Sequence, residues 1–461
     1  MKTDVAIIGG GPAGACAALY LERHGIESTI VEKVPFPRYH IGESTTGEST
    51  GILRDLGFGE RLEAAGHPHR HGARVFGSGA QPWFVPVMGR TAEGELRDEI
   101  AYQLRRSQFD AMLLDEATRH STLIPGKAVE PLFTDDGAVR GVRVRPDDGG
   151  ELDLEADLVL DCSGQATFMA ARGVTGPKYL GSYDKQIAIF SQVVGYQRDQ
   201  PADAERERMP GNTHIFYKSK FHWAWVIPLD DEVVSVGVVT PARYFLDQKE
   251  SKEAFLRREL GEIHEELARR LPTVEFVEDM HAIPNYSFQV RGFAGEGFIC
   301  VGDAHRFIDP IFSFGLYVAL SEAGFAADTA RGYLEGGGRN GDLFREHMVR
   351  CERGIDMVED FIDGFWENPL AFSILVHRRY REQMIDVFAG RIYSRDSGPP
   401  RVVEAFRELL QRERSYDDDQ HLYSVPSGSR FQPERAPLWN ARLDSVEATE
   451  QWMRELSSAP A

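Results

Sequence analysis

The sequence has few cysteines, no long apolar run and no block of lysine and arginine residues. Its four cysteines, Cys16, Cys162, Cys300 and Cys351, lie far apart and form no C-x-x-C pair, so we expect neither a dithiol centre nor a metal site. The longest apolar runs fall far short of the ~20 residues that cross a bilayer, which excludes a membrane span. The formal net charge is -20 and includes no basic tract, which argues against nucleic acid as a partner.

The length and the N-terminus define the broad class of protein. A chain of 461 residues exceeds the size of one hydrophobic core, so two or three lobes are expected. The first 20 residues contain one lysine and a short apolar run that ends in glycines. This pattern is typical of a strand that enters a turn and not of a signal peptide. The sequence therefore predicts a soluble, cytoplasmic protein.

Residues 3–33, TDVAIIGGGPAGACAALYLERHGIESTIVEK, predict a strand, a glycine turn, a helix and a second strand that ends on an acid. The turn holds a G-x-G-x-x-G motif. Its first glycine allows a tight turn, the second lets the backbone approach a pyrophosphate, and the third lets helix and strand pack closely. Glu32 ends the second strand, where its carboxylate can accept the hydroxyls of an adenosine ribose. The predicted dinucleotide contacts are Gly9, Gly11, Pro12, Ala13, Gly14, Glu32 and Lys33.

A second segment, residues 295–330, indicates which dinucleotide binds. Its FICVGD stretch predicts a buried strand that ends at Gly302 and Asp303, and an apolar helix is expected from about Gly315. Here the chain resembles the FAD-dependent monooxygenase superfamily. The resemblance implies that Gly302 and Asp303 hold the ribityl chain and that the N-terminus of the next helix faces the pyrimidine end of the flavin. Further matches near the cofactor are Arg38, the GES segment Gly42, Glu43 and Ser44, Arg106 in RRSQFD, and VLDCSG at residues 159–164.

Two further motifs narrow the resemblance to one family. FHWAWVIPL contains Trp223 and Trp225 in a pattern similar to the W-x-W-x-I-P signature of flavin-dependent halogenases. FIDPIFSFG, residues 307–315, resembles the F-x-D-P-x-F-S-S-G loop of the phenol and pyrrole branch of that family. Because the two tryptophans are spaced by one residue on a predicted strand, both point to the same face. Together the matches cover roughly residues 1–330.

The resemblance implies an α/β fold with three parts. These are a Rossmann-like FAD-binding domain of the glutathione-reductase and p-hydroxybenzoate-hydroxylase type, an antiparallel substrate-side sheet and a helical C-terminal region. We expect the FAD-binding domain in residues 1–75, 100–180 and 285–330, the sheet in 76–99 and 181–284, and the helical region in 331–461.

Helical periodicity supports part of this division. A 3.6-residue period predicts helices over residues 341–366 and 445–456, and one surface helix over 251–271. In related enzymes the C-terminal region covers the substrate pocket. Candidates for lining that pocket, with core packing as the alternative, are Phe361, Phe365, Trp366 and Phe372.

The family resemblance also implies a reaction in two separated sites. A partner supplies FADH2, O2 adds to the flavin, and chloride or bromide is oxidised to hypohalous acid, which passes through a tunnel to the substrate. The strand with Trp223 and Trp225 would keep the substrate from the flavin. The loop with Ser313 would hold the halide, with Pro310 and Gly315 against the cofactor. Because no second G-x-G-x-x-G follows a strand, we expect a separate NAD(P)H-dependent flavin reductase, with direct NADPH contact as the alternative.

The segment HPHRHGARVFGSG, residues 67–79, departs from the family. Members carry a lysine in a K-x-G-A element that captures the hypohalite, whereas this chain has RHGA and no lysine between Lys33 and Lys127. Arg70 would hydrogen-bond and polarise hypohalous acid, but a guanidinium keeps its charge and is a poor nucleophile. Phe314 is a second departure, because the family loop has a small residue there and a ring would fill the halide site.

Three functions remain open from the sequence. The first is halogenation, with Arg70 or a neighbouring histidine positioning the hypohalite. The second is a non-halogenating FAD-dependent oxidation, either hydroxylation or hydride removal, for which His71 and His305 are candidate acids or bases because imidazole titrates near neutrality. The third is a flavin-binding protein without turnover, which the intact FAD motifs disfavour. The expected substrate is an electron-rich small molecule or a carrier-protein-bound natural-product intermediate.

Overall fold

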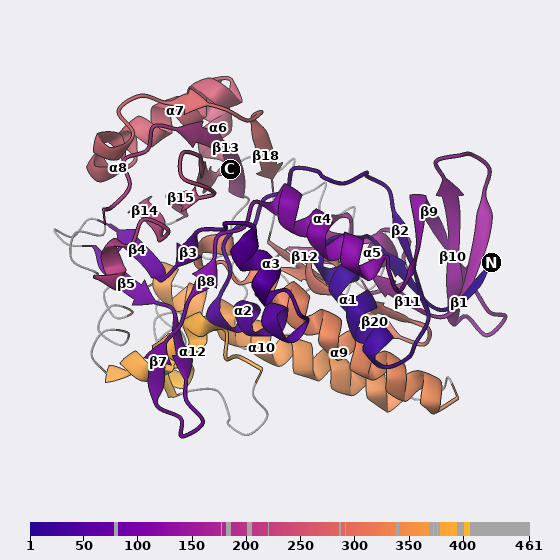
Figure 1. The fold of residues 1–461 in the computed structure, drawn as a ribbon. Helices are drawn as coiled ribbons and strands as arrows, with labels where there is room; N and C mark the ends of the chain where they lie inside the picture. Colours follow the sequence, from indigo (N-terminus) through magenta and orange to yellow (C-terminus); the bar gives the residue numbers. More distant parts are fainter. Residues whose placement is uncertain are drawn as a thin grey trace, which may run out of the picture.

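The computed structural model describes residues 1–405 apart from 78–81, 177, 181–185, 201–204, 220, 285–286, 291, 338–340, 368–371, 373–375, 377–378 and 394–400. Two large sheets and two long helices dominate this part of the chain (Figure 1). The predicted helix over residues 445–456 lies outside the described residues. No helix in the described part is long and apolar enough to cross a membrane.

The first sheet is built around parallel strands. The N-terminal strand β1 pairs in parallel with β2 and with β11, so that Val5 lies opposite Ser28 and Leu158. Strand β9 extends the parallel part beyond β2, and β21 extends it beyond β11. Continuous apolar runs such as VAII suit the parallel strands of this sheet, because such strands are covered on both faces. The seven strands are β1 (Lys2–Ile8), β2 (Ser28–Glu32), β9 (Thr122–Phe133), β10 (Val139–Pro146), β11 (Leu152–Asp161), β20 (Ala294–Gly295) and β21 (Phe298–Cys300).

Helices α1 (Pro12–Arg23) and α9 (Gly315–Glu335) pack against each other beside this sheet (Figure 1). Helix α1 begins at Pro12. Proline suits this position because an N–H in the first turn of a helix has no partner within the helix, so its absence costs no hydrogen bond. Its alanine-rich face is fully buried, which lets α9 approach closely. Both strand–turn–helix units predicted from the sequence are therefore present.

The second sheet carries the tryptophan strand. Strands β13, β16, β15 and β14 pair antiparallel in that order, and β4 joins β14 in parallel. Trp225 lies opposite Gly237, where a Cβ atom would come within 2.2 Å of the indole ring. The glycine thus makes room for the tryptophan. The strands are β4 (Gly72–Phe76), β5 (Trp83–Pro86), β13 (Gln186–Val194), β14 (Thr213–Ser219), β15 (His222–Pro228), β16 (Val234–Pro241), β17 (Glu275–Phe276) and β18 (His281–Pro284).

Three helices cover one face of the second sheet, at the top of Figure 1: α6 (Ala242–Gln248), α7 (Lys252–Glu262) and α8 (Glu265–Arg270). The prediction of one helix over residues 251–271 was wrong. His264 has an extended backbone and its Nδ1 accepts a hydrogen bond from the Glu266 N–H at 3.1 Å, which starts a new helix. A side-chain cap within the helical pattern therefore divides the segment.

The C-terminal part contains α10 (Gly341–Glu367), which confirms the predicted helix over residues 341–366, and α12 (Arg381–Ala389). Arg306 joins α10 to the first part of the chain through ion pairs with Asp356 at 2.7 Å and Glu359 at 2.5 Å. All four aromatic candidates for lining a pocket pack into one hydrophobic cluster, and none of them lines the large cavity described below. These are Phe361, Phe365, Trp366 and Phe372.

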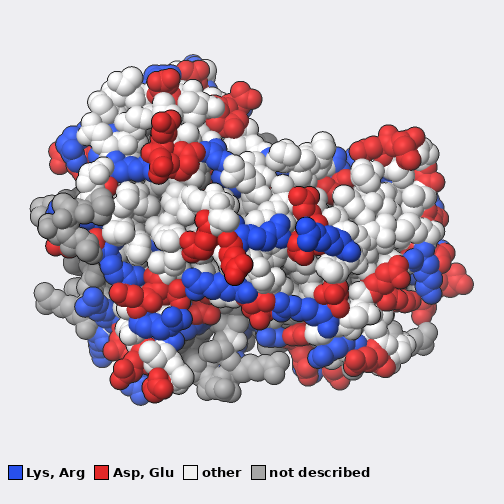
Figure 2. Space-filling model, viewed as in Figure 1, with Lys and Arg blue, Asp and Glu red and all other residues white. Residues whose placement is uncertain are grey.

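Short elements connect these layers. The helices are α2 (Gly47–Asp55), α3 (Gly59–Ala64), α4 (Arg106–Ala117) and α5 (Phe168–Ala171); the strands are β3 (His69–Arg70), β6 (Met88–Arg90), β7 (Leu96–Asp98), β8 (Ala101–Tyr102), β12 (Lys178–Leu180), β19 (Phe288–Val290) and β22 (Arg306–Phe307). On the face that α2, α3 and α4 form, basic and acidic side chains alternate (Figure 2). Arg54 pairs with Glu99 at 3.1 Å and Arg61 with Glu116 at 2.8 Å.

Candidate active site

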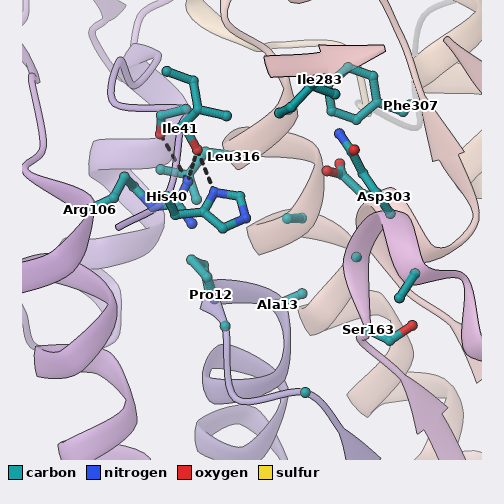
Figure 3. A pocket seen from close by; sticks show the side chains of 18 of the residues that line it. Pro12, Ala13, His40, Ile41, Arg106, Ser163, Ile283, Asp303, Phe307 and Leu316 are labelled. Atoms are coloured by element: carbon teal, nitrogen blue, oxygen red, sulfur yellow. Dashed lines mark hydrogen bonds between the residues drawn. The ribbon is translucent and has the colours of Figure 1, made fainter. Parts of the chain in front are cut away.

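A cavity of about 580 Å³, called the cleft below, lies between the two sheets. Its walls come from the N-terminal ends of α1 and α9, the carboxyl ends of β1 and β2, residues 38–44, and β13, β14 and β15 of the second sheet. Figure 3 shows His40 and Arg106 on one side, Asp303 and Ser163 on the other, and Pro12 between them. Ligands of open α/β sheets bind outside the carboxyl ends of the strands, as here.

The glycine turn has the geometry that its motif predicts. Gly9 has a φ of 103°, and a Cβ atom there would lie 2.5 Å from the Cys162 carbonyl oxygen. A Cβ atom on Gly14 would lie 1.9 Å from the Gly9 carbonyl oxygen. Gly11 faces the cleft, together with Pro12 and Ala13, whereas Gly14 is buried behind the turn. The turn therefore presents bare backbone and a helix N-terminus to the cleft, an arrangement that binds phosphate groups.

Glu32 lines the cleft at the end of β2, and its carboxylate is held by backbone groups. Oε2 accepts a hydrogen bond from the Gly10 N–H at 2.6 Å, and Oε1 accepts one from the Val34 N–H at 2.8 Å. These bonds fix the carboxylate at the cleft wall. The glycine turn and the acid are thus locked together before any ligand binds.

Basic side chains surround the same end of the cleft. Lys33 and Arg38 line it as the sequence predicts, and an Arg38 Nη atom lies 3.5 Å from the position a Gly11 Cβ would take. Lys127 of β9 and Arg172 after α5 also line it. The last two were missed, because neither belongs to a recognisable motif. Arg38 beside the helix N-terminus suits the pyrophosphate of a dinucleotide.

Arg106 holds the segment that crosses the cleft. Its guanidinium donates to the Ile41 carbonyl at 2.6 Å and to the Gly42 carbonyl at 3.2 Å, and it forms a bidentate ion pair with Asp110 at 2.6 and 2.9 Å. His40 lies in the same segment, and burial followed by the charge of Arg106 lowers its pKa to about 4. At neutral pH the His40 imidazole is therefore uncharged.

The Gly302–Asp303 turn lies opposite this segment. Gly302 has a φ of 62°, and its N–H donates to Glu322 Oε2 at 2.7 Å. Asp303 lines the cleft, whereas Gly302 is buried behind it, and burial raises the pKa of Asp303 to about 7. The turn presents a carboxyl group to the cleft next to the N-terminus of α9.

His305 lies behind the turn and does not line the cleft. It is fully buried and stacks on Phe293, with ring centroids 3.8 Å apart. Its Nδ1 lies 3.2 Å from the Glu322 carboxylate, and its Nε2 lies 3.5 Å from the Glu352 carboxylate. Burial alone would lower the pKa of His305, but the two carboxylates outweigh burial and raise it to about 9. The structure thus places His305 in a buried ion-pair network that supports the turn.

The tryptophan strand forms the opposite wall. Trp223 and Trp225 both line the cleft, with ring centroids 5.8 Å apart, which confirms that they share a face. The Trp225 Nε1–H donates to Ser235 Oγ at 3.2 Å. Phe190 and Ile283 extend this apolar wall and were not predicted, because they carry no motif.

The loop at residues 307–315 lines the cleft with Phe307 and Ile311 as well as with smaller residues. Pro310, Ser313 and Gly315 line it, and Ser313 has a φ of 62°. Phe314 is 1% exposed, belongs to the hydrophobic cluster that contains α10, and does not line the cleft. Its ring therefore leaves the cleft free, contrary to the expectation that it would fill a halide site there.

Arg70 lies in a second, small cavity of about 10 Å³, called the Arg70 chamber. Val75, Phe312 and Phe388 are among its walls, and Ile215 lines both the chamber and the cleft. The guanidinium is 7% exposed and donates from Nη1 to the Thr45 carbonyl at 2.6 Å. Its Nε has no hydrogen-bond partner and no carboxylate pairs with it among the described residues, and burial lowers its pKa to about 10.

His71 points away from both cavities. Its backbone N–H donates to Asn212 Oδ1 at 3.0 Å, and its imidazole is half-buried and lines neither the cleft nor the chamber. Burial, with Arg206 nearby, lowers its pKa. Among the described residues, no group of three or more His, Cys, Asp or Glu side chains is arranged to hold a metal ion.

Comparisons with known proteins agree with this geometry. Residues 2–340 match the family model for the FAD binding domain. The chain is 32% identical over 389 residues to a 1H-pyrrole-2-carbonyl-(peptidyl-carrier protein) brominase of Pseudoalteromonas luteoviolacea, which covers 84% of this chain and 91% of that protein. It is 28% identical over 455 residues to the corresponding chlorinase of Pseudomonas fluorescens, covering 95% and 99%. The structure of the flavin-dependent brominase Bmp2 superposes with a TM-score of 0.82 at 30% identity, covering 90% of this chain and 100% of that one.

The fold and the cleft define an FAD-binding flavoprotein with an α/β core and a second sheet over the cofactor cleft. Within this class, the chain belongs to the flavin-dependent halogenase family of the FAD-dependent monooxygenase superfamily. The family and the fold class predicted from the motifs are confirmed.

Proposed function

We propose that the protein is a halogenase that uses FADH2 and O2 to oxidise bromide or chloride and transfers the halogen to an electron-rich ring on a carrier protein. The observation that carries the proposal is Arg70. Its buried guanidinium has no acidic partner among the described residues and faces a small chamber that shares Ile215 with the cleft. A buried cation without a carboxylate favours a small anion or a strongly polar molecule beside it.

The cleft supplies the cofactor site in this proposal. When bound in its reduced form, FADH2, the cofactor would supply the two electrons that reduce O2 to the level of peroxide, and the chain would bind and orient it. Its pyrophosphate would lie at the glycine turn and its ring at the end near Trp223 and Trp225. The residues proposed to contact it are Gly9, Gly11, Pro12, Ala13, Glu32, Lys33, Arg38, Gly42, Glu43, Ser44, Arg106, Asp303, Pro310 and Gly315, with Gly14 and Gly302 shaping the turns. A separate flavin reductase would supply FADH2.

Arg70 would act in the chamber as the family lysine does in its tunnel. At about 10 Å³ the chamber has room for about one water molecule, so it would widen to admit hypohalous acid. The unpartnered Nε–H would then donate to the oxygen of that acid and polarise the bond to the halogen. Because the guanidinium stays protonated at neutral pH, the hypohalite would be held by hydrogen bonds and not through a nitrogen–halogen bond. Trp223 and Trp225 would separate the substrate from the flavin, and Ser313 would lie at the halide site.

The substrate class is proposed from the relatives. The brominase and the chlorinase act on pyrrole-2-carbonyl groups attached to a peptidyl-carrier protein. The same class of substrate, an electron-rich five-membered ring on a carrier, is proposed here. It reacts readily with electrophilic halogen, which matches the reagent that the Arg70 chamber would hold.

One experiment tests the proposal. The protein is incubated with FAD, NADH, a flavin reductase and sodium bromide, with pyrrole-2-carbonyl-carrier protein in one series and a free phenolic probe in another. We expect a brominated product, recognised by its isotope pattern in mass spectrometry and absent without bromide. Hydroxylated products that form equally well without halide would refute halogenation.

Hydroxylation is the second candidate, because Arg70 cannot form the covalent haloamine. Two variants separate the candidates. Arg70→Lys should brominate at least as fast as the native protein, whereas Arg70→Met should lose bromination about 100-fold and release hypobromite or peroxide. If neither variant changes the products, Arg70 does not handle the halogen.

A further inference from the structure

Glu43 is a buried carboxyl group at the tryptophan end of the cleft. Its side chain is 1% exposed and lines the cleft, and Oε2 has no hydrogen-bond partner among the described residues. Neighbouring bonds fix its backbone: the Leu104 N–H donates to the Glu43 carbonyl at 2.6 Å, and Ser44 Oγ lies 2.9 Å from Thr213 Oγ1. An unpartnered oxygen held against a cavity in this way is positioned for a ligand or a reacting group.

The surroundings of Glu43 keep a proton available. Burial raises its pKa to about 7, opposed by hydrogen bonds from Ser235 and Gln192 and by the charges of Arg106 and Arg105. The Tyr39 phenol, whose pKa is raised by burial, by Glu43 and by Glu278, also lies close to it. Ser235 also accepts the Trp225 Nε1–H, so the carboxyl group belongs to the tryptophan wall.

The proposed reaction consumes a proton at this place. The net step is FADH2 + O2 + X⁻ + H⁺ → FAD + HOX + H2O. The halide and the reduced flavin each give two electrons, the oxygen–oxygen bond breaks, and one oxygen forms the bond to the halogen. The other oxygen leaves as water and takes the proton. A donor fixed beside the apolar wall of Trp223 and Trp225 would supply that proton without waiting for one from bulk water.

Other titratable groups that line the cleft are unsuited to this role. The pKa of about 4 leaves the His40 imidazole without a proton to donate at neutral pH. Asp303 also has a pKa raised to about 7, but it lies at the N-terminus of α9, on the turn proposed to hold the ribityl chain. Glu43 is the carboxyl group beside the tryptophans.

A polar chain connects Glu43 to the surface. Gln192 hydrogen-bonds toward Glu43, and its Oε1 accepts from Arg105 Nη1 at 3.2 Å. Arg105 forms an ion pair with Asp230, whose side chain is 45% exposed. Polar groups that do not line the cleft therefore lead from Glu43 toward the exposed Asp230.

We propose that the Glu43 carboxyl group is the general acid of halide oxidation: it donates the proton that leaves as water and then regains one from solvent. The inference rests on the proposed halogenation. It gives a catalytic role to Glu43, which the sequence predicts only as a contact of the cofactor.

The first test does not depend on turnover. Infrared difference spectra of the FAD-loaded protein, recorded between pH 5 and 9 for the native chain and Glu43→Gln, report the carbonyl stretch of protonated carboxyl groups. Glu43 and Asp303 both have a pKa raised to about 7, so we expect protonated-carboxyl absorption that disappears as the pH rises through about 7. The part of it that belongs to Glu43 should be missing in Glu43→Gln, and the part that belongs to Asp303 should remain. The exposed Glu60→Gln on α3 serves as the matched control and should leave every band in place. Absence of the Glu43 part from the native protein overturns the inference.

The second test measures products. At pH 7 and saturating FAD we expect Glu43→Gln to brominate about 100-fold more slowly, the usual loss for a general acid, and to release hydrogen peroxide instead. Its remaining rate should rise tenfold for each unit that the pH falls, since solvent must supply the proton. A Glu43→Gln profile equal to the native one overturns the role of Glu43 while halogenation stands. A native protein that yields only non-halogenated products, with the infrared absorption of Glu43 present, instead overturns the proposed function and the inference with it.

Discussion

Replacement of Arg70 by methionine should stabilise the protein while it removes the proposed activity. The guanidinium is 7% exposed, no carboxylate pairs with it among the described residues, and burial lowers its pKa from 12.5 to about 10. That difference corresponds to roughly 3 kcal/mol of lost stability. Because the pKa in the folded state is the lower one, the loss is fully present at every pH below about 10. A methionine side chain of similar length carries no charge and therefore removes this loss of stability.

The gain is partly offset by one lost hydrogen bond. Arg70 Nη1 donates to the Thr45 carbonyl at 2.6 Å, and an unsatisfied buried carbonyl costs about 1–3 kcal/mol. The net expectation is therefore a stabilisation of about 1 kcal/mol, or roughly 1–3 °C in the thermal midpoint for a chain of this size. Arg106→Met is the matched control. It breaks a buried bidentate pair with Asp110 and should destabilise the protein by about 3–5 kcal/mol.

The assay is thermal unfolding of the apoprotein followed by circular dichroism, in sodium gluconate and in sodium bromide of equal ionic strength. Bromide should raise the midpoint of the native protein more than gluconate does, because an anion beside Arg70 compensates its charge. Arg70→Met should lose this difference. A variant destabilised by more than about 1 kcal/mol, or one that keeps the bromide response, would show that Arg70 is a structural residue and not an unpaired charge.

Two further predictions follow from the turns that shape the cleft. Gly14→Ala should weaken FAD binding at least about 100-fold in a fluorescence titration, because the new methyl group would lie 1.9 Å from the Gly9 carbonyl oxygen. The control is Gly51→Ala, which should bind FAD normally because no atom lies within 4 Å of the new Cβ position. Glu322→Gln should flatten the fall in thermal midpoint between pH 6.5 and 9. Glu322 helps to raise the pKa of His305 to about 9, so its contribution is complete below pH 6.5 and is lost as the pH rises through 9. An unchanged slope in Glu322→Gln would contradict this assignment.

The parts of the fold predicted from the sequence are those that depend on neighbouring residues. The glycine turn, the acid at Glu32 and the two tryptophans on one face follow from spacings of a few residues, and backbone sterics or strand periodicity fix their geometry. The break at His264 was missed although it is local. There a side-chain cap interrupts an apolar period that continues on both sides, so periodicity alone predicts one helix.

The properties of the site that were not predicted depend on residues far apart in the sequence. Two such properties are the lack of a carboxylate partner for Arg70 among the described residues and the network around His305. Neither can be predicted from the local segment, because the residues that surround each side chain come from other parts of the chain. The direction of the Phe314 ring depends on the cluster that α10 completes. Motifs thus identify which residues meet, whereas burial and pairing determine what each one can do.

The cleft and the Arg70 chamber are joined by three consecutive residues. Glu43 presents its carboxyl group to the cleft, the Ser44 hydroxyl bonds to Thr213 on the cleft wall, and the Thr45 carbonyl accepts from Arg70. A shift of this segment would move the proposed proton donor and the proposed hypohalite site together. If the reaction passes between these sites, effects of Glu43→Gln and Arg70→Met on the bromination rate should be strongly non-additive in a double-mutant cycle. Their effects on FAD binding should simply add, because each site contacts a different molecule.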